Sequence, residues 1–120
     1  MKLLDSFAWI EYFMGSKRGV KVKDYVEGDE PLYTPSICIT EIKSRYLRDQ
    51  KDPTTRINFI VEGSFIIPLD KEIALLAADI KQKHKLHTID AIIYATSQHK
   101  NLTLVTGDQH FKDLPSVKII

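Results

Sequence analysis

Four acidic residues have the type and the surroundings that metal chemistry needs: Asp5, Glu41, Asp90 and Asp108. Carboxylate oxygens are hard ligands, and two or three of them that converge suit Mg²⁺ or Mn²⁺. A divalent ion held in this way can lower the pKa of a water, orient that water and stabilise the charge that develops on a phosphate. The four acids are therefore candidate catalytic residues and candidate metal ligands for phosphodiester hydrolysis.

Two of these acids follow short apolar runs that are typical of buried β-strands. Asp5 ends the run 2–5, and Asp108 lies two residues beyond the run 102–106. In an open parallel α/β sheet, ligands bind at the carboxyl ends of the strands. Both carboxylates are therefore expected at that edge of a sheet.

The other two acids lie near the starts of predicted helices. Glu41 falls in the second turn of a helix over 36–49 that follows a short strand at 32–34. Asp90 falls in the first turn of a helix over 88–100. A helix that follows a parallel strand begins at the carboxyl edge, so its first turns overhang that edge. We expect Glu41 to reach the site in this way, and Asp90 too if its helix points its amino end to the same edge.

Apolar periodicity, together with residues typical of helix starts and helix ends, predicts the helices and strands that must hold these acids. Strands are predicted at 2–5, 32–34, 65–69, 102–106 and 117–120, and helices at 6–15, 17–27, 36–49, 52–63, 70–84 and 88–100, with one helical turn at 108–112. The predicted helix caps are Ser6, Asp52, Asp70 and Thr88, and Gly15 is predicted to end the first helix. Strands that alternate with helices of this length indicate a mainly parallel sheet. The predicted fold class is α/β, a three-layer α/β/α domain with a central five-stranded sheet, whose strand order stays open.

Composition limits the function classes. The chain has 120 residues, 43% of them hydrophobic and 28% charged, which predicts one domain over 1–120. No apolar run approaches the roughly 18 residues that a membrane helix needs, so no membrane partner is expected. The single cysteine, Cys38, excludes an intramolecular disulfide and favours a cytoplasmic location. A net charge of +1 would not hold nucleic acid by charge alone, but bound metal ions would change the sign of an acidic site.

Each acid also has a purely structural alternative. Asp90 could favour the helix dipole by roughly 0.3–1 kcal/mol. Glu41 could pair with Arg45 at i+4, which stabilises a helix by roughly 0.2–0.5 kcal/mol. Asp108 could be a turn or cap residue, and Asp5 could belong to a turn. The inference of a site therefore rests on the set of four.

Basic and histidine side chains offer further candidates. Arg45 and Arg48 lie at i+4 and i+7 from Glu41 and could reach substrate phosphates, although solvated charge or pairing with Glu41 explains them equally well. Lys17 and Arg18 carry the same two interpretations. The four histidines lack a zinc-ligand spacing such as His-x-x-x-His, and the one near the predicted site lies two residues beyond Asp108.

Four sequence blocks together resemble the PIN domain family and, in size and layout, the VapC-like toxins of toxin–antitoxin pairs. The blocks are Leu4-Asp5-Ser6-x-x-Trp9-Ile10, Thr40-Glu41-Ile42, Asp90-Ala91-x-Ile93-x-Ala95-Thr96 and Leu104-Val105-Thr106-x-Asp108-x-His110-Phe111. They follow in the right order and at compatible spacings over nearly the whole chain.

This resemblance implies a parallel five-stranded sheet between helices, with the four acids holding Mg²⁺ or Mn²⁺ and with Ser6 and Thr106 as supporting hydroxyls. It also implies endonucleolytic cleavage of single-stranded or looped RNA by an activated water, a homodimer, and a cognate antitoxin whose tail covers the acidic site. Many relatives carry a further acid two residues past the last aspartate, where this chain has His110. We therefore expect one metal and leave a second open.

Three other interpretations stay open or are disfavoured. A receiver-type signalling domain would need adjacent acids after the first strand, and only Asp5 is present there. A catalytically silent PIN-like binding module would not need the complete quartet. An RNA-processing or quality-control nuclease would use the same chemistry in a different cellular role.

The candidates for a dimer face are Trp9, Tyr12, Phe13 and Tyr46, with a core position as the favoured alternative for Trp9 and Phe13.

Overall fold

Strands and helices alternate along the chain in the predicted order. A computed structural model describes residues 1–120. Its elements are β1 (Lys2–Leu4), α1 (Ser6–Met14), α2 (Lys17–Glu27), β2 (Leu32–Pro35), α3 (Ser36–Arg48), α4 (Thr54–Gly63), β3 (Phe65–Ile67), α5 (Lys71–His84), α6 (Thr88–His99), β4 (Thr103–Thr106), the 3₁₀ turn η1 (Gln109–Phe111) and β5 (Val117–Ile119). None of the helices combines the length and the apolar character that spanning a membrane requires.

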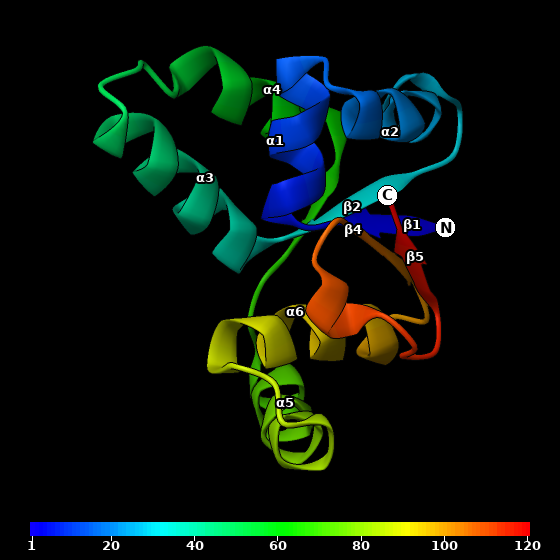
Figure 1. Ribbon diagram of the computed structural model, residues 1–120. Helices are drawn as coiled ribbons and strands as arrows, with labels where there is room; N and C mark the ends of the chain where they lie inside the picture. The colour runs from blue at the N-terminus through cyan, green and yellow to red at the C-terminus, as the bar shows by residue number, and fades with distance from the viewer.

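The five strands form one parallel sheet in the order β3-β2-β1-β4-β5. Helices α1 to α4 lie on one side of this sheet and α5 and α6 on the other (Figure 1). The predicted α/β/α fold class is therefore confirmed. The chain moves outward from β1 to β3 and then crosses to β4, so the strand order reverses at β1. In open α/β sheets this reversal is where ligands bind, outside the carboxyl ends of the strands.

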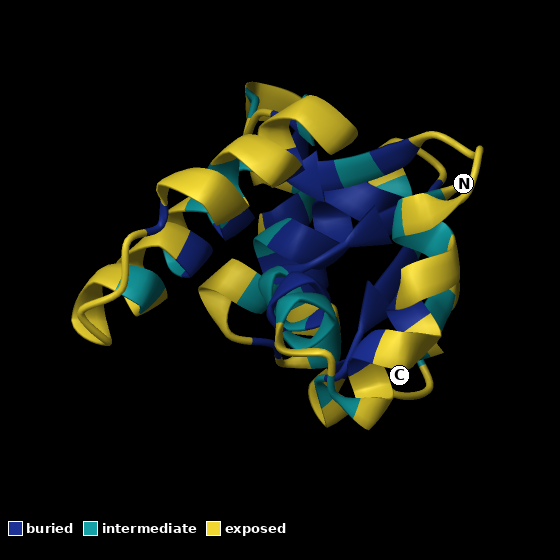
Figure 2. Cartoon of the chain, turned by 90° about the horizontal axis from the view of Figure 1, so that it is seen from above, coloured by how far each residue is buried: buried dark blue, intermediate teal, exposed yellow.

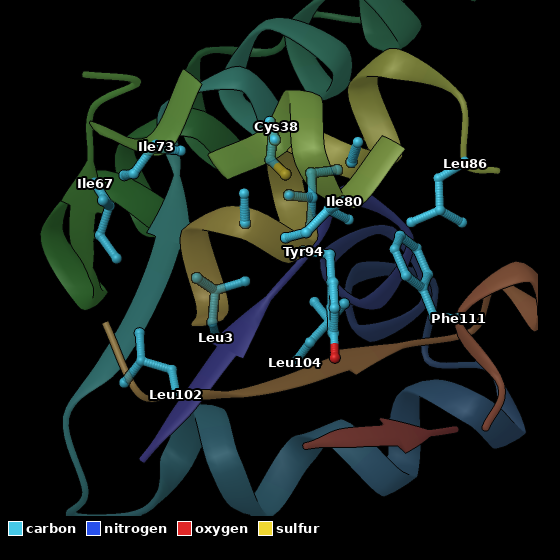
Figure 3. Close-up of a cluster of buried hydrophobic side chains, with 14 residues drawn as sticks. Leu3, Cys38, Ile67, Ile73, Ile80, Leu86, Tyr94, Leu102, Leu104 and Phe111 are labelled. Atoms are coloured by element: carbon cyan, nitrogen blue, oxygen red, sulfur yellow. The ribbon is translucent and has the colours of Figure 1, made fainter. Parts of the chain in front are cut away.

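Two apolar cores hold the layers together, because successive strand residues point to opposite faces. Leu3 faces the layer of α5 and α6, where it joins Leu104 and Tyr94 (Figure 3). Leu4 faces the opposite layer, where it joins Trp9 in a second cluster. The strands lie buried in the middle of the molecule, and the outer faces of the helices are exposed (Figure 2). This packing fixes both strand ends that carry site residues.

The start of α1 differs from the prediction in a way that matters for the site. Asp5, not Ser6, caps the helix: its Oδ1 accepts the N–H of Ala8 at 2.9 Å. Asp5 leaves β1 with an extended backbone, which is the conformation of an N-cap residue. Ser6 becomes the first helical residue, and its hydroxyl is free to contact another element. Gly15 ends α1 as predicted, in the left-handed region at φ 65°.

The other predicted caps give mixed results. Asp70 caps α5 as predicted, with its Oδ1 accepting an N–H at 2.9 Å. Asp52 accepts the N–H of Thr54 at 2.9 Å, so it supports α4 from two residues before the helix. The prediction for Thr88 is wrong, because α6 begins at Thr88 itself and His87 occupies the cap position without a side-chain bond.

The aromatic residues of α1 belong mostly to the core. Trp9 is fully buried, and its Nε1 donates to Thr34 Oγ1 at 3.0 Å. Phe13 is half-buried and stacks on Trp9 with ring centroids 5.7 Å apart. The core interpretation of Trp9 is therefore confirmed, and Trp9 cannot form a dimer face. Tyr12 and Tyr46 are half-buried and stay candidates for one.

Candidate metal centre

The structure brings the four predicted acids together at the carboxyl edge of β1 and β4. Asp5 follows β1, Asp108 follows β4, and Glu41 and Asp90 project from the first two turns of α3 and α6. Repulsion from Glu41 and from Asp108 helps to raise the pKa of Asp5. In the same way Asp90 raises the pKa of Glu41, and Asp108 raises the pKa of Asp90. Each acid therefore lies within electrostatic reach of two others, and the four form a closed ring.

Asp5 is the buried member of this ring. Its side chain is held from both sides, since Oδ1 accepts the Ala8 N–H and Oδ2 accepts the hydroxyl of Thr106. With only 4% of the residue exposed, burial raises its pKa from 3.8 to about 7. A carboxylate in this position is costly to ionise unless a cation lies next to it.

Thr106 connects the exits of the two central strands. Its buried hydroxyl donates to Asp5 and accepts the backbone N–H of Asp108 at 3.1 Å. Asp108 in turn caps η1, because its Oδ1 accepts the N–H of His110 at 2.9 Å. The predicted alternative role of Asp108 as a cap is therefore real, but it uses only one of the two carboxylate oxygens.

Glu41 is held by the hydroxyl that the Asp5 cap leaves free. Ser6 Oγ donates to Glu41 Oε1 at 2.9 Å, which joins α1 to α3. Burial is the main cause of the raised pKa of this half-buried carboxyl. The predicted alternative, an ion pair with Arg45, is wrong, because the only ion pairs of the chain are Arg48–Asp49 and His110–Asp108.

Asp90 faces the ring from the opposite layer. Burial raises its pKa first and repulsion from Asp108 second, while the imidazoles of His110 and His87 act in the other direction. Asp90 also lies in the first turn of α6, where a negative charge is favourable. One ligand atom each from Asp90, Asp108 and His110 lie within 4.8 Å of one another.

The donor set fits a divalent metal ion. None of the four carboxylates pairs with a lysine or an arginine, and the only basic partner is the His110 side chain, with Nδ1 at 3.0 Å from Asp108 Oδ1. Several carboxylates that converge without a compensating cation are destabilised by repulsion and by loss of solvent. Oxygen-rich sites of this kind are the ones that hold Mg²⁺ or Mn²⁺ in proteins.

The two predicted substrate residues on α3 do not contact the acids. Arg48 is exposed, and its Nε lies 3.2 Å from the carboxylate of its neighbour Asp49. Arg45 lines a groove of about 450 Å³ between α1, α3 and α4, together with Phe13 and Tyr46. The two arginines follow Glu41 by one and two turns of α3, and neither forms an ion pair with it.

Arg18 lies closer to the ring than its place in the sequence indicates. Its guanidinium carbon is 5.6 Å from the centre of the Phe7 ring. The Phe7 ring packs against Gly107, where even a Cβ atom would come within 2.1 Å of it. Gly107 directly precedes Asp108, so Phe7 borders the acidic ring. Arg18, which lies over Phe7, is therefore close to the ring as well. The sequence offered no signal for this contact, since it depends on how α2 folds back along α1.

Comparison with known families decides the classification of this fold and site. The model of the PIN domain family matches residues 2–117. The chain belongs to the PIN domain family. None of the curated proteins compared with it matches.

Solved structures place this PIN domain beside toxins of toxin–antitoxin pairs. A toxin–antitoxin complex from Klebsiella pneumoniae contains a chain that is 27% identical with a TM-score of 0.82, over 98% of this chain and 96% of that one. VapC20 of Mycobacterium tuberculosis, a toxin that cleaves the sarcin–ricin loop, is 12% identical with a TM-score of 0.80, over 99% and 98%. DNA-bound VapBC from Salmonella typhimurium is 17% identical with a TM-score of 0.70, over 99% and 96%. The last two likenesses concern the fold alone.

Proposed function

We propose that this PIN domain is a metal-dependent endoribonuclease and the toxin of a toxin–antitoxin pair. The observation that carries the proposal is the ring of four carboxylates without a lysine or arginine partner, at the point where the strand order reverses. PIN domain toxins are generally nucleases, which supports the same reaction class.

Asp5, Glu41, Asp90 and Asp108 would hold the ion. When bound, Mg²⁺ or Mn²⁺ would lower the pKa of a water and neutralise the charge that develops on the phosphate. The chain's own groups position this chemistry. The Ala8 N–H and the Thr106 hydroxyl prevent Asp5 from rotating. Ser6 donates to Glu41 Oε1, so the other oxygen, Oε2, would be free to accept a proton from the attacking water.

The RNA substrate would approach over the Arg18 side of the ring. Arg18 stacks on Phe7 and makes no ion pair, so its guanidinium is available to a phosphate next to the cleaved bond. Arg45 and Arg48 stay predictions for phosphates farther along a longer RNA. Neither arginine makes an ion pair with one of the four acids, so we propose no direct part in the reaction for them.

A cognate antitoxin is the proposed protein partner. The 27% identical chain from Klebsiella pneumoniae comes from a toxin–antitoxin complex, and the alignment covers nearly all of both chains. The groove between α1, α3 and α4 combines aromatic side chains with charges of both signs, such as Arg56 and Asp52. A groove of this mixed character suits a segment of a protein partner. A homodimer stays part of the proposal.

RNA cleavage by matched carboxylate variants tests the nuclease assignment. We expect Asp90→Asn to reduce cleavage at least roughly 100-fold with Mg²⁺ or Mn²⁺ present. The matched control is Glu72→Gln, which removes an exposed acid from the first turn of α5 and should cleave like the parent. The parent should also lose activity in a chelator. Equal cleavage by the parent and Asp90→Asn, or no effect of the chelator, would contradict the proposal and favour a PIN-like binding module.

A further inference from the structure

The His110 imidazole lies so close to Asp90 and Asp108 that the three side chains could bind one ion together. Its Nδ1 is 3.0 Å from Asp108 Oδ1, and the Asp90 carboxylate completes a group whose ligand atoms all lie within 4.8 Å of one another. Ligand atoms about 2.1 Å from an octahedral ion are about 3.0 Å apart when adjacent and about 4.2 Å apart when opposite. The three side chains therefore have nearly the spacing of one coordination sphere before any ion is present.

The backbone fixes His110 in this place. Its own N–H is bound by the Asp108 carboxylate, so the residue is carried on the turn that this aspartate caps. The next residue, Phe111, is 1% exposed and anchors the turn in the core. The imidazole also packs edge-on against His87, with ring centroids 6.1 Å apart. The imidazole therefore stands at the rim of the acidic site, supported from the side of the sheet that α5 and α6 cover.

An imidazole changes which ion the site prefers. Mg²⁺ binds hard oxygen ligands and keeps several waters, whereas Mn²⁺ shares the preference for oxygen but, as a first-row transition ion, also accepts an imidazole nitrogen. A site with only carboxylates and waters would bind Mg²⁺ and Mn²⁺ through the same contacts. One nitrogen ligand would strengthen the binding of Mn²⁺ while adding nothing for Mg²⁺.

We propose that His110 is a nitrogen ligand of the metal centre, beside Asp90 and Asp108, and that it gives this PIN domain a preference for Mn²⁺ over Mg²⁺. The inference rests on the proposed function, because it needs the acidic ring to hold a divalent ion. It adds a ligand that is not one of the four acids, and it assigns the ion.

Binding of Mn²⁺ and of Mg²⁺ to the full chain, each measured by calorimetry, provides the test. In His110→Ala the affinity for Mn²⁺ should fall at least roughly tenfold, while that for Mg²⁺ should stay within about twofold of wild type. The matched control is His99→Ala, which removes an exposed imidazole from the last turn of α6 and should bind both ions like wild type. His110→Gln, which keeps a polar side chain on the turn, should show the same selective loss.

Pulsed electron paramagnetic resonance of the Mn²⁺-loaded protein identifies the ligand directly. Wild type and His99→Ala should show the coupling of one nitrogen to Mn²⁺, and both His110 variants should lack it. Mn²⁺ bound tightly by wild type without nitrogen coupling, or unchanged Mn²⁺ affinity in the His110 variants, would overturn this inference alone. No binding of either ion by wild type would overturn the proposed function and this inference together.

Discussion

The Asp5 carboxylate is buried at the edge of the sheet, and its only close partners are hydrogen-bond donors. Its pKa near 7 makes the metal-free protein sensitive to pH. Between pH 3.8 and about 7 the folded protein holds a proton on Asp5 that the unfolded chain has lost. The stability that this proton contributes is complete below pH 3.8 and is lost as the pH rises through 7.

For the chelated protein we therefore expect the free energy of unfolding to fall between pH 5 and pH 8, by up to about 4 kcal/mol from Asp5 over its whole range. Urea unfolding at a series of pH values measures it. Asp5→Asn should retain only the smaller pH dependence that the raised pKa values of Glu41 and Asp90 contribute. The same pH dependence in Asp5→Asn and in wild type would show that Asp5 is not the group responsible.

The Thr106 hydroxyl supports two acids at once. Thr106→Val keeps the β-branched shape but removes the donor to Asp5 and the acceptor of the Asp108 N–H. We expect a loss of about 1–3 kcal/mol in stability and a roughly 10- to 100-fold loss in metal affinity. Urea unfolding and calorimetry measure the two effects. Thr103→Val, on the same strand, is the matched control and should change neither. Unchanged metal affinity in Thr106→Val would contradict a supporting role.

At the scale of elements, α2 contributes to the site by folding back along α1. Arg18 reaches the Phe7 ring in this way, and that ring packs on Gly107 beside Asp108. If Arg18 contacts a phosphate, Arg18→Ala should weaken RNA binding. The slope of log K against the logarithm of the salt concentration should also become shallower, by the amount expected for about one phosphate contact. Binding measured on a metal-loaded, cleavage-deficient Asp90→Glu background at several salt concentrations checks this.

The matched control for Arg18 is Lys83, an exposed cation on α5. Lys83→Ala removes the same charge from the opposite layer and should leave the salt dependence unchanged. Arg48→Ala should have a smaller effect than Arg18→Ala, because Arg48 already pairs with Asp49. An equal loss in all three variants would mean that only the total charge matters.

The element boundaries could largely be predicted from the sequence because their signals are local. Gly15 and Asp70 end and cap their helices as expected, since each acts within one turn of its own position. The sequence predicts the cap of α1 one residue too late, at Ser6. Asp5 and Ser6 are both good N-cap residues, and which one caps the helix depends on the residue at which β1 ends. The Ser6–Glu41 bond could not be foreseen for the same reason.

At the scale of the whole molecule, the strand order decides which acids meet. Periodicity predicted parallel strands but not their neighbours, because apolar alternation marks burial and carries no information about pairing. The order β3-β2-β1-β4-β5 sets β1 beside β4, which brings the Asp5 and Asp108 positions together. The four acids were predicted as a set, whereas the contacts of His110 and Arg18 depend on this three-dimensional arrangement.

The proposed toxin role makes a prediction at the same scale. Production of the wild-type protein in bacterial cells without an antitoxin should arrest growth, and Asp90→Asn should be tolerated at the same protein level. Growth curves with quantified expression measure the difference, and Glu72→Gln serves as the toxic control. Equal growth with wild type and Asp90→Asn would favour a role in RNA processing or quality control over a toxin.

Metal binding by variants of the four acids is the decisive measurement, because the proposed function requires these carboxylates to form one cation site. Calorimetry with Mn²⁺ should give one binding event for wild type and for Glu72→Gln. We expect the affinity to fall at least roughly tenfold in each of four single variants: Asp5→Asn, Glu41→Gln, Asp90→Asn and Asp108→Asn. Wild-type affinity in these four variants, with their folds intact, would contradict a metal site built from the four acids.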